Sequence, residues 1–182
     1  MREPDERRFA ELMLYVSEKS ARDPKFGATK LNKILFYSDF LAFAQLGDSI
    51  TGFEYQKLEH GPAPRRIVSM RKTLEKDGAL TVEKVPLREG REQVRLVPKR
   101  KPRMSVFGKG EIAVVDEVIK QLWGHDAESV SALSHIEIGW QVAQLNETIP
   151  YGTIFLSDKA LNDEDVRRIQ HFAEEHGYTA RR

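Results

Sequence analysis

The stretch Thr29-Lys30-Leu31-Asn32-Lys33-Ile34-Leu35-Phe36-Tyr37 decides the fold of this chain, and the apolar pattern that it begins continues to Leu46. Its apolar side chains would fall on two sides of a helix, with Leu31, Ile34, Leu35 and Leu41 on one and Phe36, Tyr37, Phe40 and Phe43 on another. Gly47 provides a C-terminal stop. A helix that is apolar almost all round is buried on several sides. The sequence therefore predicts a central buried helix over about residues 29–46.

Helices and short strands are predicted on both sides of this central helix. A helix over about 5–22 is indicated by apolar residues at helical spacing, namely Phe9, Leu12, Met13 and Val16. Further helices are predicted over about 64–77, 109–123, 126–133 and from residue 162 or 163 to 177, with a turn or two within 137–145. Strands are predicted at 53–56 and 153–156, and a β-hairpin over about 79–98. The predicted fold is α+β and mainly helical: one domain of residues 1–182, with its core at about 5–177 and a protruding β-hairpin.

Composition excludes several classes of protein. The 182 residues are 40% hydrophobic and 31% charged, and 29 basic against 28 acidic residues give a net charge of +1. That charge is too small to favour nucleic acid or an anionic membrane as the partner. The chain has no cysteine, which excludes disulfides and a Cys nucleophile. It begins with no apolar signal region and has no stretch of ~20 apolar residues that could span a bilayer, so we expect a cytoplasmic protein.

Motifs for catalysis, metal binding and phosphate binding are missing from the sequence. The five histidines form no His-Glu-x-x-His pattern, and His171 and His176 would not share a helix face. The pair Ser134-His135 lacks the Gly-x-Ser-x-Gly setting of a hydrolase nucleophile. Gly108-Lys109-Gly110 lacks the spacing of a phosphate-binding loop. We therefore expect a protein that is not an enzyme and that holds no metal or cofactor.

A cluster of basic residues raises one alternative function. Five are expected on the outer side of the third predicted helix: Arg65, Arg66, Arg71, Lys72 and Lys76. The run Lys99-Arg100-Lys101-Pro102-Arg103 follows the predicted hairpin. Three helices followed by a hairpin are the order of a winged-helix domain. Against this, the second helix is unusually apolar for that motif and acidic residues weaken the positive field. A winged-helix, DNA-binding transcriptional regulator is the alternative interpretation.

His60 lies in the run His60-Gly61-Pro62-Ala63-Pro64, between a predicted strand and the predicted third helix, whose first turn tolerates proline. Two interpretations stay open for this histidine. It orients a loop or meets a partner, or its ring makes hydrogen bonds that lock the turn. Trp140 and Tyr151 are anchors of either the core or an interface, and the core is the default expectation.

Three stretches, in this order, resemble the Panacea, or SocA-like, antitoxin domain. They are residues 29–39 with a Lys-Leu-x-Lys pattern, residues 55–64 with a Gly-Pro turn, and the region from Ser134-His135 through Trp140 to Tyr151. The resemblance covers roughly residues 10–150. The family's motifs fall on Lys30, Leu31, Lys33, Gly61, Pro62 and Trp140. The chain departs from the family in its Pro62-Ala63-Pro64 run, and its long charged hairpin is a candidate for selecting the partner.

The resemblance implies a non-enzymatic protein of bacteria or phages that neutralises a cognate protein toxin by direct binding. We expect a steric mechanism, in which a rigid domain covers the working site of the toxin. Because arginine and aromatic side chains often dominate interfaces, the candidate partner-binding residues are His60, Arg65, Arg66, Arg88 and Arg91. The sequence leaves the identity of the toxin and the oligomeric state open.

Overall fold

The computed structural model describes residues 2–87 and 90–156, together with Arg167 and His171. The helices of this part are α1 (Glu6–Lys19), α2 (Ala28–Leu46), α3 (Ile67–Lys76), α4 (Lys109–Gln121), α5 (Ala127–His135) and α6 (Ile138–Val142). The strands are β1 (Tyr55–Leu58), β2 (Gly61–Pro64), β3 (Leu80–Pro86), β4 (Glu92–Pro98) and β5 (Thr148–Ile149), and the short 3-10 helices are η2 (Met104–Val106) and η3 (Tyr151–Phe155). The predicted α+β, mainly helical fold is confirmed. The helix predicted from residue 162 or 163 to 177 lies outside the described residues, apart from Arg167 and His171.

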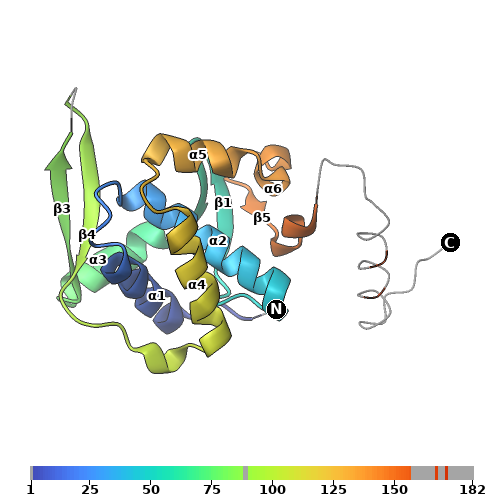
Figure 1. Cartoon of the computed structure of the whole chain (residues 1–182), viewed down its shortest axis with the longest axis horizontal. Coiled ribbons are helices and arrows are strands. Elements are labelled where there is room, and N and C mark those ends of the chain that lie inside the picture. The colour runs from blue at the N-terminus through green and yellow to red at the C-terminus, as the bar shows by residue number, and fades with distance from the viewer. Residues whose placement is uncertain (1, 88–89, 157–166, 168–170, 172–182) are drawn as a thin grey trace.

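α2 is the central helix that the sequence predicts, and the other elements surround it (Figure 1). It packs against α1, α4, α5, β2, β4 and η3. Gly47 ends the helix with φ at 80°, and its amide donates to the Phe43 carbonyl. The side chains of α2 that face the core are at most 2% exposed: Leu31, Ile34, Leu35, Phe36 and Phe40. Tyr37, Leu41 and Phe43 are only partly buried, so one side of α2 is less covered than the sequence predicts.

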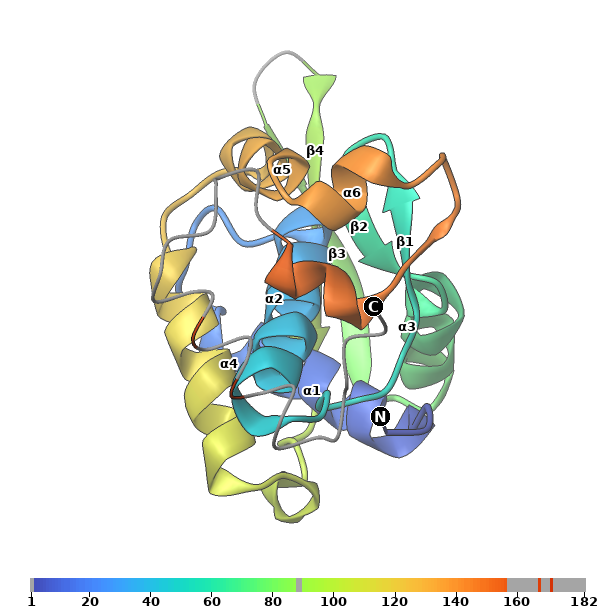
Figure 2. The ribbon, with the colours of Figure 1, turned by 90° about the vertical axis from the view of Figure 1, so that its right-hand side faces the viewer.

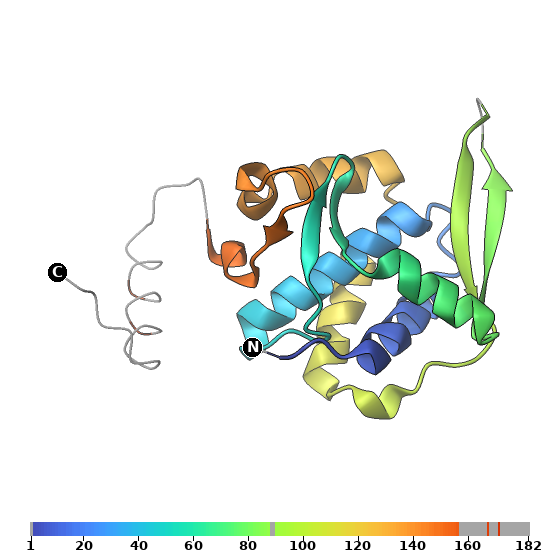
Figure 3. The ribbon, with the colours of Figure 1, turned by 180° about the vertical axis from the view of Figure 1, so that it is seen from behind.

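β3 and β4 form the predicted hairpin, which protrudes at the edge of the molecule opposite β5 (Figure 3). The two strands pair in antiparallel register along their whole length. Leu80 and Leu96 are buried at the base of the hairpin. The Arg95 guanidinium donates to the Ala21 carbonyl at 2.9 Å, which ties β4 to the segment that follows α1. The base is therefore part of the core, and the tip projects from it.

A second sheet, with strand order β2-β1-β5, corrects a sequence prediction. Residues 61–64 form strand β2 and not a turn that leads into a helix at Pro64, and α3 begins downstream. Proline is tolerated in β2 because this strand is at an edge of the sheet. The Arg65 amide donates to the Glu54 carbonyl. In the alternating antiparallel ladder, Pro62 and Pro64 therefore take the positions whose missing N–H would point away from β1.

The strand predicted at 153–156 is wrong, and local bonding explains why. This region forms η3, where Thr153 donates both its backbone N–H and its hydroxyl to the Pro150 carbonyl. Such i to i+3 bonds occupy donors that a strand would offer to its neighbour. Strand pairing occurs just upstream instead, where Thr148 and Ile149 pair with β1.

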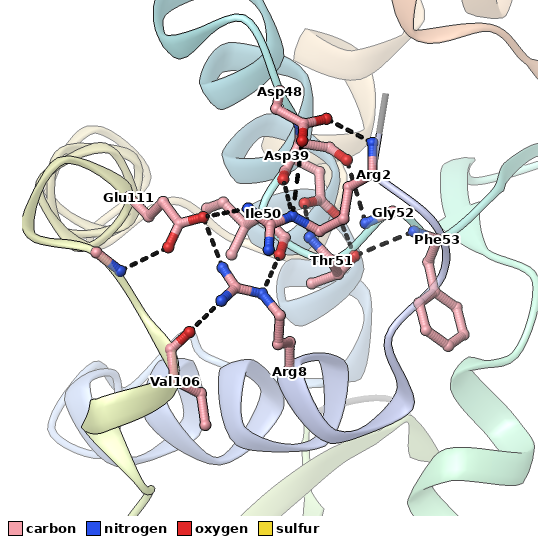
Figure 4. Close-up of polar contacts among 12 residues, drawn as sticks. Arg2, Arg8, Asp39, Asp48, Ile50, Thr51, Gly52, Phe53, Val106 and Glu111 are labelled. Carbon is pink, nitrogen blue, oxygen red and sulfur yellow. Dashed lines mark hydrogen bonds and ion pairs between the residues drawn. The ribbon is translucent and has the colours of Figure 1, made fainter.

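Arg8 on α1 joins three segments through a guanidinium that is mostly buried (Figure 4). Its Nε donates to the Ile50 carbonyl at 2.6 Å, and an Nη atom lies 2.6 Å from the Glu111 carboxylate. The other Nη atom donates to the Val106 carbonyl. Arg2 also contacts Glu111, at 3.1 Å. Arg8 thereby fixes the loop after α2, the end of η2 and the first turn of α4 to α1.

Arg8→Met is expected to lower the free energy of unfolding by about 2 kcal/mol, because it removes hydrogen bonds to a carboxylate and to two carbonyls. The loss stays moderate because Arg2 still contacts Glu111. Chemical denaturation measures the effect, with Lys120→Met on the exposed face of α4 as the control. Equal losses in the two variants would contradict the role assigned to Arg8.

Candidate functional site

The turn between β1 and β2 is held by side chains from three different helices. Lys33 on α2 donates from Nζ to the His60 carbonyl at 2.5 Å. Ser131 on α5 donates its hydroxyl to the same carbonyl at 3.1 Å, and Trp140 on α6 donates from Nε1 to the Leu58 carbonyl at 3.1 Å. We call the five residues Lys33, Leu58, His60, Ser131 and Trp140 the turn cluster. Its three donors come from separate elements and hold the turn in one conformation.

Burial shapes the electrostatics around the turn cluster. Lys33 is 1% exposed and also donates to the Pro62 carbonyl at 3.2 Å, and burial lowers the pKa of Lys33 to about 8. The His135 ring stacks on Trp140 with centroids 3.9 Å apart. The Lys57 ammonium lies 4.3 Å from the centre of the Trp140 ring. Burial, with help from the nearby Lys33 charge, lowers the pKa of His135.

The family-motif residues proposed from the sequence all have contacts inside the domain. Lys30 pairs with Asp23, with an Nζ–Oδ2 distance of 2.7 Å, and both side chains are buried. Leu31 is a core residue, Pro62 lies in β2, and Lys33 and Trp140 belong to the turn cluster. Gly61 has φ at 95°, which favours glycine. Trp140 is partly buried, so the default expectation of a core tryptophan holds only in part.

His60 fixes the turn through its backbone carbonyl, which corrects the interpretation that its ring does so. The residue itself is exposed. It lines a concave surface of about 690 Å³ together with Arg91 from the hairpin and Ser131 and His135 from α5. The structure therefore brings two of the candidate partner-binding residues, His60 and Arg91, to one surface. Arg88 lies outside the described residues.

Arg65 and Arg66 lie elsewhere and precede α3, so they are not on its outer face as the sequence suggests. The Arg65 guanidinium donates to the Thr148 hydroxyl at 2.9 Å and to the Asn146 carbonyl at 2.8 Å, which connects the end of β2 to β5. Arg66 forms an exposed ion pair with Glu6. Both side chains therefore already make contacts within the chain.

An apolar groove between α2 and α4 is a feature that the sequence analysis missed. We call it the α2–α4 groove; its volume is about 570 Å³. α2 and α4 lie beside each other, and the corner between α5 and α6 closes one end. The apolar lining includes Leu41, Val114, Val118 and Leu122, and more exposed residues at the margin, Leu46, Leu133 and Ile136.

Helical spacing alone does not reveal this groove. Val130 and Ser134 mark the buried face of α5, and Leu133 falls outside that face. Leu46 is the last residue of α2, and Ile136 is the residue that follows α5. Periodicity assigns apolar residues such as Leu46 and Leu133 to a core, so only the packing of the helices shows that these three residues are exposed. Leu46 is 48% exposed, Leu133 is 39% exposed and Ile136 is 68% exposed.

The charged groups at the groove are acidic. Glu137 lines one end, and burial raises the pKa of its carboxyl although a hydrogen bond from the Tyr37 hydroxyl opposes that rise. Glu117 lines the α4 side, where Gln121 and Lys120 hold its pKa below the ordinary value. The described lining residues include no lysine, arginine or histidine. The groove is therefore apolar with two carboxylates at its margin.

The described residues offer little that points to metal binding or to a serine nucleophile. Among them, no three His, Asp or Glu side chains are grouped to hold a metal ion. The buried Ser134 hydroxyl donates to the Ser131 carbonyl at 2.8 Å and is not presented to a substrate.

Membrane insertion by a helix finds no support in the part of the chain that the structure describes. None of its helices has the length and apolar character that crossing a bilayer requires.

A family comparison adds to this geometry. The sequence model of the family described as Antitoxin SocA-like, Panacea domain, matches residues 31–141. This span begins in α2 and ends in α6, and it contains the turn cluster and every residue that lines the α2–α4 groove. No curated protein and no solved structure matches the chain.

Proposed function

Because this chain belongs to the SocA-like antitoxin family through its Panacea domain, we propose that it neutralises a protein toxin by binding it directly. The system would be bacterial or phage-borne, and the binding would take place in the cytoplasm. Neutralisation would be steric and would require no catalysis by the antitoxin, because the domain covers the toxin's working site. The toxin is one whose gene lies beside that of this chain.

The observation that carries the proposal is the coincidence of the family match with the two surfaces described above. The matched residues 31–141 hold a rigid turn that exposes His60 and an apolar groove of about 570 Å³. Apolar grooves between helices are one kind of surface through which proteins recognise a partner helix. Lys33 and Trp140, which hold the turn, are among the residues on which the family's motifs fall.

The winged-helix alternative has less support. Three of the basic residues on which it rests are paired within the chain: Arg65 with Glu54, Arg66 with Glu6 and Arg100 with Glu11. Phosphate binding depends on unpaired lysine and arginine side chains. We therefore favour a protein toxin over DNA as the partner.

Co-expression with the product of the neighbouring reading frame tests the proposal. We expect that product to arrest growth when expressed alone, and we expect this chain to restore growth and to co-purify with the toxin. A harmless neighbour, or a toxin that stays active and unbound in the presence of this chain, would contradict the proposed function.

A further inference from the structure

We propose that the α2–α4 groove receives an amphipathic α-helix of the toxin, with its apolar face inside the groove and a lysine or arginine directed at Glu137 or Glu117. This inference rests on the proposed function and adds to it a contact surface and the chemistry of the segment that fills it. Insertion of a helix into an apolar groove is a recurrent mode of protein recognition.

The dimensions of the groove fit about three turns of helix. Along α4 the lining runs from Gly110 to Leu122, which is about 18 Å at a rise of 1.5 Å per residue. Along α2 it runs from Tyr37 to Leu46, about 14 Å on the same scale. Walls of this length are long enough to contact about three turns of a partner helix.

The margin of the groove presents exposed apolar side chains. Leu46 comes from α2, and Leu133 and Ile136 come from the end of α5, so the exposed groups stand on different walls of one groove. A helix laid between them would remove all three from water at once. Burial of apolar surface of this kind is the main favourable term in such association.

Charge complementarity selects a basic helix. Glu137 is half-buried at the end of the groove, and within the described residues it forms no ion pair. Its hydrogen bond from the Tyr37 hydroxyl fixes the carboxyl but supplies no positive charge. Glu117 adds a second carboxylate on the α4 side, and its contact with Lys120 is an exposed one. A lysine or arginine on the incoming helix would supply the cation that Glu137 lacks.

Two substitutions of matched exposure test the surface. Ile136→Asp is expected to weaken toxin affinity at least tenfold, because it places a charge where an apolar contact forms. Val68→Asp is the control, because Val68 is a similarly exposed apolar residue on α3, across the molecule from α4 (Figure 2). It is expected to change affinity by less than twofold. Glu137→Gln is expected to weaken binding about threefold and to reduce its dependence on salt.

The absence of cysteine from the sequence allows a direct test of occupancy. Ala113→Cys, in the groove lining, carries an environment-sensitive dye, and Lys72→Cys on α3 carries the same dye as the control. Adding the toxin, the product of the neighbouring reading frame, is expected to shift the emission to the blue at position 113 and to leave it unchanged at position 72.

Three results would overturn the proposal. Binding that leaves the emission at position 113 unchanged, with full affinity in Ile136→Asp, would remove the groove from the interface while the antitoxin function stands. Emission that is already blue-shifted in the chain alone would assign the groove to another part of the same chain, or to a second copy if the shift depends on concentration. A wild-type chain that neither binds nor neutralises the toxin would instead refute the proposed function itself.

Discussion

Gly61→Ala is expected to lower the free energy of unfolding by about 4 kcal/mol. Gly61 has φ at 95°, where an L-residue is strained by roughly 1–2 kcal/mol. A Cβ atom at this position would also overlap the Ser134 hydroxyl and lie 2.6 Å from Lys33 Nζ. Crowding of this kind costs about 1–3 kcal/mol, and here it displaces the ammonium group that holds the turn. The methyl group would therefore act on the backbone and on the turn cluster together.

Gly78→Ala separates these two causes. Gly78 also has a positive φ, at 66°, but a Cβ atom there would have no neighbour within 4 Å. We expect it to cost about 1 kcal/mol, the contribution of the backbone alone. Equilibrium denaturation of the two variants gives the difference. If Gly61→Ala cost no more than Gly78→Ala, crowding of the new methyl group by Ser134 and Lys33 would contribute nothing to the loss of stability.

The Ser134→Ala background provides a second measurement. It removes one of the two groups that a methyl at position 61 would meet. We expect Gly61→Ala to cost less in this background than in the wild type, because neighbouring substitutions in contact are not additive. The same cost in both backgrounds would exclude Ser134 as a source of the crowding.

The helical part of the fold could be predicted from the sequence because its information is local. The apolar spacing of residues 9–16 and 29–46 places α1 and α2 within a few residues, and Gly47 marks the end of α2. The hairpin of β3 and β4 is equally local, since only residues 87–91 separate its two strands. In each case a single continuous stretch of sequence contains all the information that specifies the element.

The three-stranded sheet could not be predicted in the same way. β5 pairs with β1 across some 90 residues of chain, and it is two residues long, too short for a period-2 pattern. β2 contains Pro62 and Pro64, which favour a turn or a helix start when read locally. Only its position at an edge of the sheet makes the prolines compatible with a strand.

The site shows the same division. The resemblance selected Lys33, Gly61 and Trp140, and the structure brings these residues to one turn, although spacing alone could not show that a lysine amine meets backbone carbonyls. The α2–α4 groove was missed because its walls come from separate helices. Leu46 and Ile136 are ordinary apolar residues until the packing of α2, α4 and α5 leaves them uncovered.

Lys30→Met is expected to lower the free energy of unfolding by about 4 kcal/mol, because it leaves the Asp23 carboxylate buried without its cation. Burial alone raises the pKa of Asp23, but hydrogen bonds from the Lys30 side chain and the Lys25 amide outweigh it and hold that pKa below the ordinary value of 3.8. A carboxyl with a lowered pKa in the folded state stabilises the fold above the unfolded pKa and loses this contribution as pH falls. The difference between wild type and Lys30→Met should therefore be full at pH 7 and narrow below about pH 4.

A double-mutant cycle decides whether the cost belongs to the pair or to Lys30 alone. Lys30→Met combined with Asp23→Asn is expected to be more stable than Lys30→Met, since no uncompensated charge then stays buried. Lys120→Met, which breaks the exposed contact with Glu117, is the surface control and is expected to change stability by less than about 0.5 kcal/mol. A double variant no more stable than Lys30→Met would contradict the charge explanation.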